Sequence, residues 1–355
     1  MERDNHNHSS VDNFFEGTEK LLEVWFGRSD GNDDAGCDLR IIPRDSLDEL
    51  LKNVHCNIIS CKKNTSMDAY VLSESSMFVS KKRFILKTCG STTLLYAIQP
   101  LIYLVTTITG FDEVQDLFYS RKNFMKPELQ SDIHQDFSSE VKTLDSLFDN
   151  GTAHCLGSVN RDCWYLYTLT PAGYGIHDAD QTIEISFFML SAVMFLDCHI
   201  YVLMQDLDQD KMRIFSKEIC SVGSEATRKS GIDKLLPDMI IDDVLFDPCG
   251  YSMNGILPNG HYITIHITPE PECSYVSFES NIPLECYYEL VTKLLKTFNP
   301  KKFIITVFAN ELSIAASYHK NRNHMKYQDY QQLDFHFCRL NTYDLSYMLF
   351  AKAPS

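Results

Sequence analysis

The stretch YITIHIT at residues 262–268 alternates between apolar and polar side chains. Its isoleucines share one parity, while Thr264, His266 and Thr268 share the other. Successive side chains of a β-strand point to opposite faces of the sheet. We therefore predict a buried strand with one apolar and one polar face, and we expect His266 on the polar face.

The rest of the chain mixes strand and helix patterns. Residues 19–26 alternate in the same way, although that run also tolerates a helix with Glu16, Glu19 and Glu23 on one face, and we favour the strand. Further strands are predicted at 83–88 and 274–279, and helices at 46–51, 91–107, 140–148 and 285–297. Because strands and helices do not alternate strictly, we predict an α+β fold with antiparallel sheets rather than a doubly wound parallel sheet. No dinucleotide-binding or Walker signature and no internal repeat is visible.

Composition narrows the class of protein. The chain has 355 residues, of which 44% are hydrophobic and 23% charged, with a net charge of -16. This length allows one large domain or two ordinary ones. The negative charge argues against a nucleic-acid ligand and favours cationic ligands. The 12 cysteines include no Cys-x-x-Cys pair, which favours reduced thiols over disulfides and argues against a zinc site.

Several segments bear on location and on loops. Residues 1–13 are polar and lack the apolar core of a secretory signal, so we expect a disordered arm and a cytosolic protein. The uncharged run 91–111 raises the question of a membrane span, but Pro100 and several threonines favour a buried helix kinked at Pro100. The apolar run 185–196 is too short to cross a bilayer. Loops are expected at 28–38 and 205–210, the second as an acidic turn rather than a metal loop.

The segment YVLSESSMFVS at residues 70–80, followed by KTCG at 87–90, carries possible chemistry. A serine hydroxyl that attacks the preceding carbonyl converts an amide into an ester. Elimination then leaves a dehydroalanine, which hydrolyses to a pyruvoyl group that acts as an electrophile and electron sink. On Glu74-Ser75-Ser76 alone, an edge strand with a serine-rich turn is the favoured interpretation, because such tripeptides are common. The choice between the two interpretations depends on the rest of the sequence.

Five segments resemble the eukaryotic S-adenosylmethionine decarboxylases: residues 14–26, 70–80, 118–127, 248–255 and 264–272. The similarity fades after about residue 300, and residues 186–217 do not resemble the family. The resemblance implies a four-layer αββα sandwich of two antiparallel sheets flanked by helices, built as one domain over residues 1–355. It also implies cleavage into a β chain of residues 1–74 and an α chain of residues 75–355, assembled as a homodimer of αβ units.

The resemblance also implies roles for individual residues. Ser75 would become the pyruvoyl cofactor after cleavage of the Glu74–Ser75 bond. In this family the processing donor, the processing base and the proton donor of turnover correspond to Ser252, His266 and Cys89. The remaining site residues are Glu16 and Glu19 for catalysis, Phe15 and Phe246 around the adenine, Glu270 on the ribose, and Leu72 and Glu74 lining the site. Without the resemblance, each residue taken singly favours an ordinary structural role: a turn serine, a core histidine, an inert buried thiol or a core phenylalanine.

An acidic group forms the second implied site. Asp180, Thr182 and Glu184 share one strand face, and the family places them between the sheets with Glu23 and Glu279. Clustered buried carboxylates need cations, protons or water. In the animal enzymes putrescine fills that need as an activator, with Lys87 and Arg121 nearby. An ordinary exposed strand face is the alternative.

The leading hypothesis is decarboxylation of S-adenosylmethionine to the aminopropyl donor for spermidine and spermine. A non-catalytic regulatory paralogue of the same family is the alternative, against which the joint presence of Glu74, Ser75, Cys89, Ser252 and His266 argues. A serine hydrolase is a third possibility, but the Gly-x-Ser-x-Gly motif is missing.

Overall fold

The computed structural model describes residues 15–32, 36–169, 198–271, 274–310, 313, 315, 327, 329–340 and 343–353. The N-terminal arm expected at 1–13 and the apolar run at 185–196 lie outside the described residues. Asp180, Thr182 and Glu184 also lie outside them.

The first half of the chain builds an eight-stranded antiparallel sheet, in the order β2-β3-β4-β5-β1-β6-β8-β7. Its central strand β1 pairs with β5 and β6, so the residues just before β1 lie close to the ends of both neighbours. The strands are β1 (Lys20–Gly27), β2 (Ile58–Lys63), β3 (Met67–Leu72), β4 (Ser75–Ser80), β5 (Arg83–Thr88), β6 (Glu113–Lys122), β7 (Gly151–Gly157) and β8 (Cys163–Leu169).

The second half builds another eight-stranded antiparallel sheet, in the order β10-β11-β12-β13-β9-β14-β16-β15. This order is that of the first sheet with eight added to each strand number, so the two halves share one topology. The strands are β9 (Cys198–Gln205), β10 (Ile240–Leu245), β11 (Tyr251–Ile256), β12 (Tyr262–Thr268), β13 (Tyr275–Ser280), β14 (Lys302–Asn310), β15 (Tyr330–Arg339) and β16 (Tyr343–Lys352).

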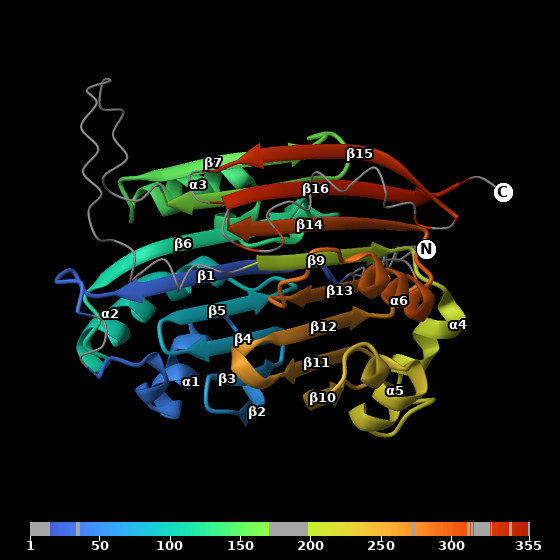
Figure 1. Cartoon of the computed structure of the whole chain (residues 1–355), viewed down its shortest axis with the longest axis horizontal. Helices are drawn as coiled ribbons and strands as arrows, with labels where there is room; N and C mark the ends of the chain where they lie inside the picture. The colour runs from blue at the N-terminus through green and yellow to red at the C-terminus, as the bar shows by residue number, and fades with distance from the viewer. Residues whose placement is uncertain are drawn as a thin grey trace, which may run out of the picture.

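The two sheets and the helices outside them form four layers (Figure 1). Hydrophobic clusters fill the spaces between these layers. The described α-helices are α1 (Arg44–Lys52), α2 (Ile98–Ile108) and α3 (Phe137–Asp145) on the first sheet, and α4 (Gln209–Met212), α5 (Gly223–Ser230) and α6 (Tyr288–Phe298) on the second. Side chains such as Phe78 and Tyr262 fill the space between the sheets. The α+β fold class and the αββα sandwich are therefore confirmed.

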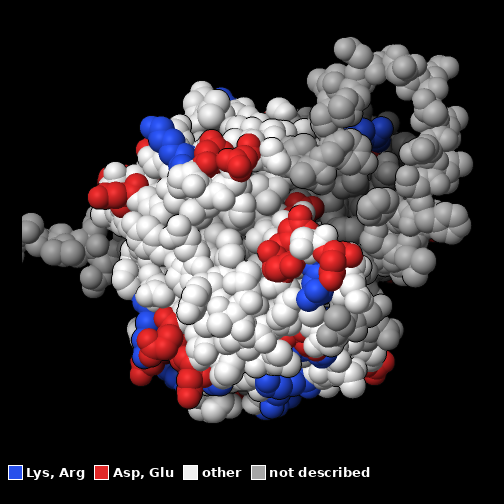
Figure 2. Space-filling model, turned by 90° about the vertical axis from the view of Figure 1, so that its left-hand side faces the viewer, with Lys and Arg blue, Asp and Glu red and all other residues white. Residues whose placement is uncertain are grey.

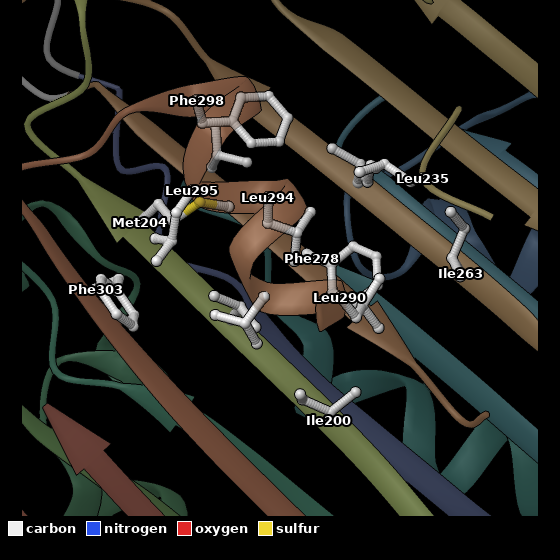
Figure 3. Packing of buried hydrophobic residues seen from close by; sticks show 14 of the residues in the cluster. Ile200, Met204, Leu235, Ile263, Phe278, Leu290, Leu294, Leu295, Phe298 and Phe303 are labelled. Atoms are coloured by element: carbon white, nitrogen blue, oxygen red, sulfur yellow. The ribbon is translucent and has the colours of Figure 1, made fainter. Parts of the chain in front are cut away.

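Helix α6 shows how an outer layer is attached. Its apolar residues recur at helical spacing, and Figure 3 shows Leu290, Leu294 and Phe298 packed over Met204 and Phe278 of the second sheet. Each of these side chains is at least nine-tenths buried. Burying a large apolar side chain contributes about 1.5–3 kcal/mol, so this stripe anchors the helix.

Most predicted elements are present, and the predicted strand at 262–268 is β12. Its isoleucines enter the core beneath α5 and α6, while Thr264 and His266 face the first sheet. The strands predicted at 19–26, 83–88 and 274–279 correspond to β1, β5 and β13. The helices predicted at 46–51, 140–148 and 285–297 correspond to α1, α3 and α6 within a few residues.

The prediction of a buried helix kinked at Pro100 was wrong. The chain forms a 3-10 turn at Leu94–Ala97, and α2 begins only at Ile98. Pro100 therefore lies in the first helical turn, where its missing N–H is not needed. One face of α2 is buried, whereas Tyr103 on another face is 68% exposed. Within the described residues, no helix combines the length and apolar character that a membrane crossing requires.

The end of the molecule that carries α1 and α2 faces the viewer in Figure 2. Most of this face is uncharged, and the Lys, Arg, Asp and Glu side chains form small groups that include both signs. Among the described residues on this face there is no broad basic area of the kind that binds a phosphate backbone.

Candidate active site

Ser75 occupies a strained position where the chain turns from β3 into β4. Strand β3 ends at Leu72, and Ser75 is the first residue of β4, opposite Thr88 of β5. Ser75 is 1% exposed and has a φ of 151°. Residues with a side chain rarely adopt such an angle, and the strain costs on the order of 1–3 kcal/mol. The turn therefore holds the Glu74–Ser75 peptide in an unusual, solvent-excluded geometry.

The Ser75 hydroxyl contacts two groups that can accept its proton. It donates a hydrogen bond to Oε1 of Glu19 at 2.7 Å, and Nε2 of His266 lies 3.0 Å from the same oxygen. Glu19 immediately precedes β1, whereas His266 comes from β12 in the opposite sheet. The packing of the two sheets thus brings together groups that lie 56 and 191 positions from Ser75.

Glu19 is held in its ionised form. Burial by itself would raise the pKa of this carboxyl, but the nearby Lys87 ammonium and the hydrogen bond from Ser75 bring the pKa below its ordinary value. The Lys87 ammonium lies 3.2 Å from Oε2 of Glu19. The carboxylate is therefore ionised and accepts the Ser75 hydrogen bond, while its lowered pKa makes it a weaker base than an ordinary carboxylate.

His266 is held in its neutral form. Burial lowers the pKa of the imidazole to about 4, although Glu19 acts in the opposite direction. Its Nδ1 lies 2.7 Å from the hydroxyl oxygen of Ser252, and its Nε2 lies 3.1 Å from that of Ser76. The neutral imidazole keeps one ring nitrogen unprotonated and can accept a proton at neutral pH, but its lowered pKa makes it a weaker base than an ordinary histidine.

Cys89 contacts the carbonyl that precedes Ser75. The backbone N–H and the thiol of Cys89 both donate to the carbonyl oxygen of Glu74, each at 2.9 Å. Burial raises the pKa of the thiol well above its ordinary value, so the sulfur keeps its proton near neutral pH. Two donors aimed at one carbonyl oxygen can stabilise the negative charge that develops there when the carbonyl carbon is attacked.

A cavity of about 340 Å³ opens beside this cluster. Phe15, Glu16, Glu74 and Gly90 contribute to its lining. Both Glu16 oxygens are engaged, because Oε1 accepts from the N–H of Thr18, while Oε2 accepts from the residues that follow β6. The cavity lies next to the Ser75 turn and has an acidic wall, which suits a cationic substrate.

Three predicted substrate residues lie away from that cavity lining. Leu72 is fully buried in the core beneath the first sheet's helices, because the even positions of β3 face that way. Phe246 packs beside Gly250, and its N–H donates to the carbonyl of Gly250 at 2.9 Å. Glu270 lies near Cys249, whose thiol pKa is raised by burial and by that carboxylate.

Two residues of the predicted acidic group, Glu23 and Glu279, are buried and belong to strands of opposite sheets. Lys87 bridges Glu19 and Glu279, with a distance of 2.7 Å from its ammonium to Oε2 of Glu279. Glu23 accepts from the indole of Trp25 at 2.6 Å, and Nε2 of His199 lies 3.5 Å from Glu23. The Ser75 cluster and the inter-sheet carboxylates are thus joined through one lysine.

Arg121 does not join the inter-sheet carboxylates. On β6, Phe118 and Ser120 face the other sheet, so Arg121 points to the opposite face. Its guanidinium binds both carboxylate oxygens of Glu140 at 2.9 Å and lies 4.2 Å from the ring centre of Phe124. Strand alternation explains why its position differs from the expectation.

Sequence reasoning missed several residues of the site. Asn254 accepts the Ser76 hydroxyl at 2.7 Å and donates to the carbonyl of Tyr70 at 2.9 Å. His199 lies between the sheets, and Lys20 lies behind the Cys89 turn. The alternation in β12 pointed to its polar face, but no sequence signal identifies which side chains of the other sheet meet it. Among the described residues, no group of His, Cys, Asp or Glu is arranged to hold a metal ion.

Fold and site together define a class: an α+β sandwich in which two sheets enclose a serine at a strained turn with a carboxylate and a neutral histidine. The family model described as adenosylmethionine decarboxylase matches residues 12–351. The chain belongs to the adenosylmethionine decarboxylase family.

Individual relatives agree with this assignment. The chain is 47% identical over 344 residues to the S-adenosylmethionine decarboxylase proenzyme of Xenopus laevis, covering 97% of each chain. It is 49% identical over 346 residues to the proenzyme of Drosophila melanogaster, covering 94% of each. A crystal structure of a Trypanosoma brucei AdoMetDC-delta26 monomer superposes with a TM-score of 0.57 at 25% identity, covering 78% of this chain and 99% of that one.

Proposed function

We propose that this chain is an S-adenosylmethionine decarboxylase that cleaves itself between Glu74 and Ser75 and carries a pyruvoyl group made from Ser75. Its product would be the aminopropyl donor for spermidine and spermine. The observation that carries the proposal is the pairing of an activated Ser75 hydroxyl with a Glu74 carbonyl held by two donors of Cys89.

The first step of cleavage follows from this geometry. The Ser75 oxygen attacks the Glu74 carbonyl carbon, and its proton passes to the acceptors that contact it, Glu19 or His266. The Cys89 N–H and thiol stabilise the oxyanion. Breaking the carbon–nitrogen bond then leaves an ester between Glu74 and the Ser75 oxygen, with a free amine on residue 75.

The second step needs a base for the α-proton of residue 75. Neutral His266 is positioned for this task and is oriented by Ser252. Elimination releases the Glu74 carboxylate and leaves a dehydroalanine. Water then replaces its nitrogen, and ammonia departs as the pyruvoyl group is formed. A pyruvoyl group supplies an electron sink for decarboxylation without pyridoxal phosphate.

The substrate would bind in the cavity beside the turn. Its lining includes the aromatic ring of Phe15 and the carboxylates of Glu16 and Glu74, which suit a nucleoside with a sulfonium cation. Phe246 and Glu270 would complete the site around adenine and ribose, as the family resemblance implies. This assignment requires the substrate to extend beyond the cavity lining.

A direct experiment tests the proposal. The purified protein should run as two chains on a reducing denaturing gel, and mass spectrometry should place the break between Glu74 and Ser75. The cleaved protein should release labelled carbon dioxide from carboxyl-labelled S-adenosylmethionine. An intact chain without this release would contradict self-cleavage and favour the regulatory paralogue.

We also propose putrescine as an activator that binds between the sheets at Glu23 and Glu279. The support is a pair of buried carboxylates near a cavity that Phe118 and Phe308 help to line. That cavity measures about 30 Å³, which is room for a water molecule rather than a diamine. Binding would therefore require this space to widen, and a putrescine-dependent rise in melting temperature would test it.

Two further properties are proposed by analogy with the family: a cytosolic location and a homodimer of αβ units. The outer strand β15 exposes Leu333 and Phe337 by 57% and 38%, and apolar side chains at the edge of a sheet can contact another chain. Light scattering on the cleaved protein tests the dimer. A mass of one αβ unit at all concentrations would contradict it.

A further inference from the structure

Lys20 is a fully buried lysine at the start of β1. It is 0% exposed and lies between Thr88 of β5 and Arg121 of β6. Its parity matches that of Leu22 and Val24, so its side chain points away from the inter-sheet carboxylates and toward the helical layer. Burial of an ammonium group is costly without compensating partners, so the contacts of Lys20 need an explanation.

The described partners of Lys20 are neutral. Its ammonium donates to the carbonyl oxygen of Gly90 at 2.9 Å and to Oε1 of Gln130 at 3.3 Å. It also lies 5.3 Å from the ring centre of Phe124. Within the described part of the chain, no carboxylate forms an ion pair with this ammonium. The shortest contact of this buried charge is therefore with the backbone of the Cys89–Gly90 turn.

That turn carries the two donors that hold the Glu74 carbonyl. Gly90 has a φ of 60°, and its N–H donates to the carbonyl of Glu16 at 2.9 Å. A Cβ atom at Gly90 would lie 3.0 Å from the ring of Phe15. The N–H of Gly90 thus binds Glu16 at one side of the cavity, and the carbonyl of Gly90 binds Lys20. These two hydrogen bonds fix the orientation of Gly90, which directly follows Cys89.

We propose that Lys20 is a positioning residue for backbone cleavage: its ammonium holds the Gly90 carbonyl and thereby keeps the Cys89 N–H and thiol on the Glu74 carbonyl oxygen. The inference rests on the proposed self-cleavage. Lys20 touches neither the Ser75 hydroxyl nor the Glu74 carbonyl, so it acts through Cys89 and Gly90.

The charge of Lys20 gives this role a pH signature. Burial lowers the pKa of its ammonium to about 8. The charged and titratable groups around it are Cys89, Glu140, Arg121, Glu16, Glu74, His134 and Cys56. The ammonium form, with its charge-assisted bond to Gly90, is complete below that pH and is lost as pH rises. Cleavage should therefore slow as pH rises through about 8.

The experiment uses the full chain made by cell-free translation, pulse-labelled and then transferred to buffers between about pH 6.5 and 9.5, a range that brackets the Lys20 pKa. Cleavage is followed by gel over time. Lys20→Met should slow cleavage on the order of tenfold at about pH 7, as expected when one charge-assisted hydrogen bond is removed. Its rate should no longer fall through about pH 8. Lys20→Arg keeps the charge, so it should restore cleavage and also lose the alkaline decline.

Lys122→Met is the matched control. Lys122 is also buried, but it pairs with Asp162, which keeps Lys302 as a second partner. This control should cleave at the parent rate and keep the alkaline decline. The same decline in Lys20→Met would assign the titration to another group, such as the buried Asp116, whose pKa burial raises to about 8.

The outcomes separate the inference from the function on which it rests. A parent chain that never cleaves contradicts self-cleavage itself. A parent that cleaves, with Lys20→Met cleaving equally fast and with the same pH profile, overturns only the role of Lys20. If Lys20→Met fails to fold, the cleavage rate of the parent chain is measured against pH instead. A parent rate that does not decline between about pH 7 and 9.5 also overturns the proposal.

Discussion

The carbonyl oxygen of Glu74 accepts two hydrogen bonds from one residue, because the backbone nitrogen and the sulfur of Cys89 both lie 2.9 Å from it. The next residue, Ser75, has a strained backbone and a hydroxyl bound to an ionised carboxylate. One peptide bond thus has a polarised carbonyl on one side and an activated nucleophile on the other. This arrangement favours attack of the Ser75 hydroxyl on the Glu74 carbonyl.

Replacing Ser75 by Ala should leave one uncleaved chain without decarboxylase activity, since no hydroxyl remains to attack the Glu74 carbonyl. A reducing gel and the intact mass measure this. Ser76→Ala is the matched control: it removes a neighbouring hydroxyl that also contacts His266 but leaves the nucleophile, so it should still yield two chains. Normal cleavage of the Ser75→Ala chain would refute the assignment of the nucleophile.

His266→Ala should stop maturation at the ester, because the α-proton of residue 75 then has no base. The ester remains a single chain by mass, but hydroxylamine should split it at Glu74, whereas an amide resists that reagent. Comparing gels with and without hydroxylamine detects the difference. Maturation at the parent rate would place the base elsewhere.

The pKa of His266 should be measurable by NMR in the uncleaved Ser75→Ala chain. Burial lowers it to about 4, below the ordinary value of about 6.5. As pH falls, the imidazole of residue 266 is protonated in the unfolded chain at about pH 6.5 but in the folded chain only at about pH 4. Protonation of the unfolded chain therefore lowers the free energy of unfolding as pH falls between these two values. The loss from this group is on the order of 3 kcal/mol. A titration midpoint near 6.5 would contradict the buried neutral state.

Cys89→Ala should still cleave, more slowly, because the backbone N–H remains as one donor to the Glu74 carbonyl. Removing one oxyanion donor costs about 2.7–4 kcal/mol in barrier height in a well-studied protease, which sets an upper range. The cleaved variant should decarboxylate poorly if the thiol supplies a proton during turnover. Cys89→Ser keeps a donor and should cleave faster than Cys89→Ala; equal turnover of parent and both variants would exclude that role of the thiol.

Putrescine should stimulate the parent enzyme, since ionised carboxylates between the sheets attract the diammonium. Asp180→Asn, Glu184→Gln and Glu23→Gln each remove charge with little change of volume, so each should weaken the response. Decarboxylation is compared with and without putrescine after equal cleavage has been verified by mass spectrometry. Equal stimulation of all four proteins would show that these residues do not bind the activator.

The sequence determined the local structure to a large extent. Alternating side chains in 19–26 and 262–268 identified β1 and β12. A strand with one apolar and one polar face shows this alternation directly in its sequence. The Glu74-Ser75 motif and the resemblance identified the residues that meet at the turn. Pro100 was misjudged because proline restricts a helix start and a helix interior differently, and only packing showed which applied.

Tertiary structure decided strand pairing, the contacts between the two sheets and the burial of charged groups, none of which the local sequence pattern specifies. The two halves share one strand order, which is held by backbone hydrogen bonds between strands. Different side chains are compatible with the same backbone pairing, so the shared topology left no visible repeat in the sequence. The packing of one sheet on the other placed His266 against Ser75, and strand parity turned Arg121 toward Glu140. The lowered pKa values of Lys20 and His266 follow from burial, and the partners of both side chains are distant in the sequence, so neither property exists until the sheets have packed.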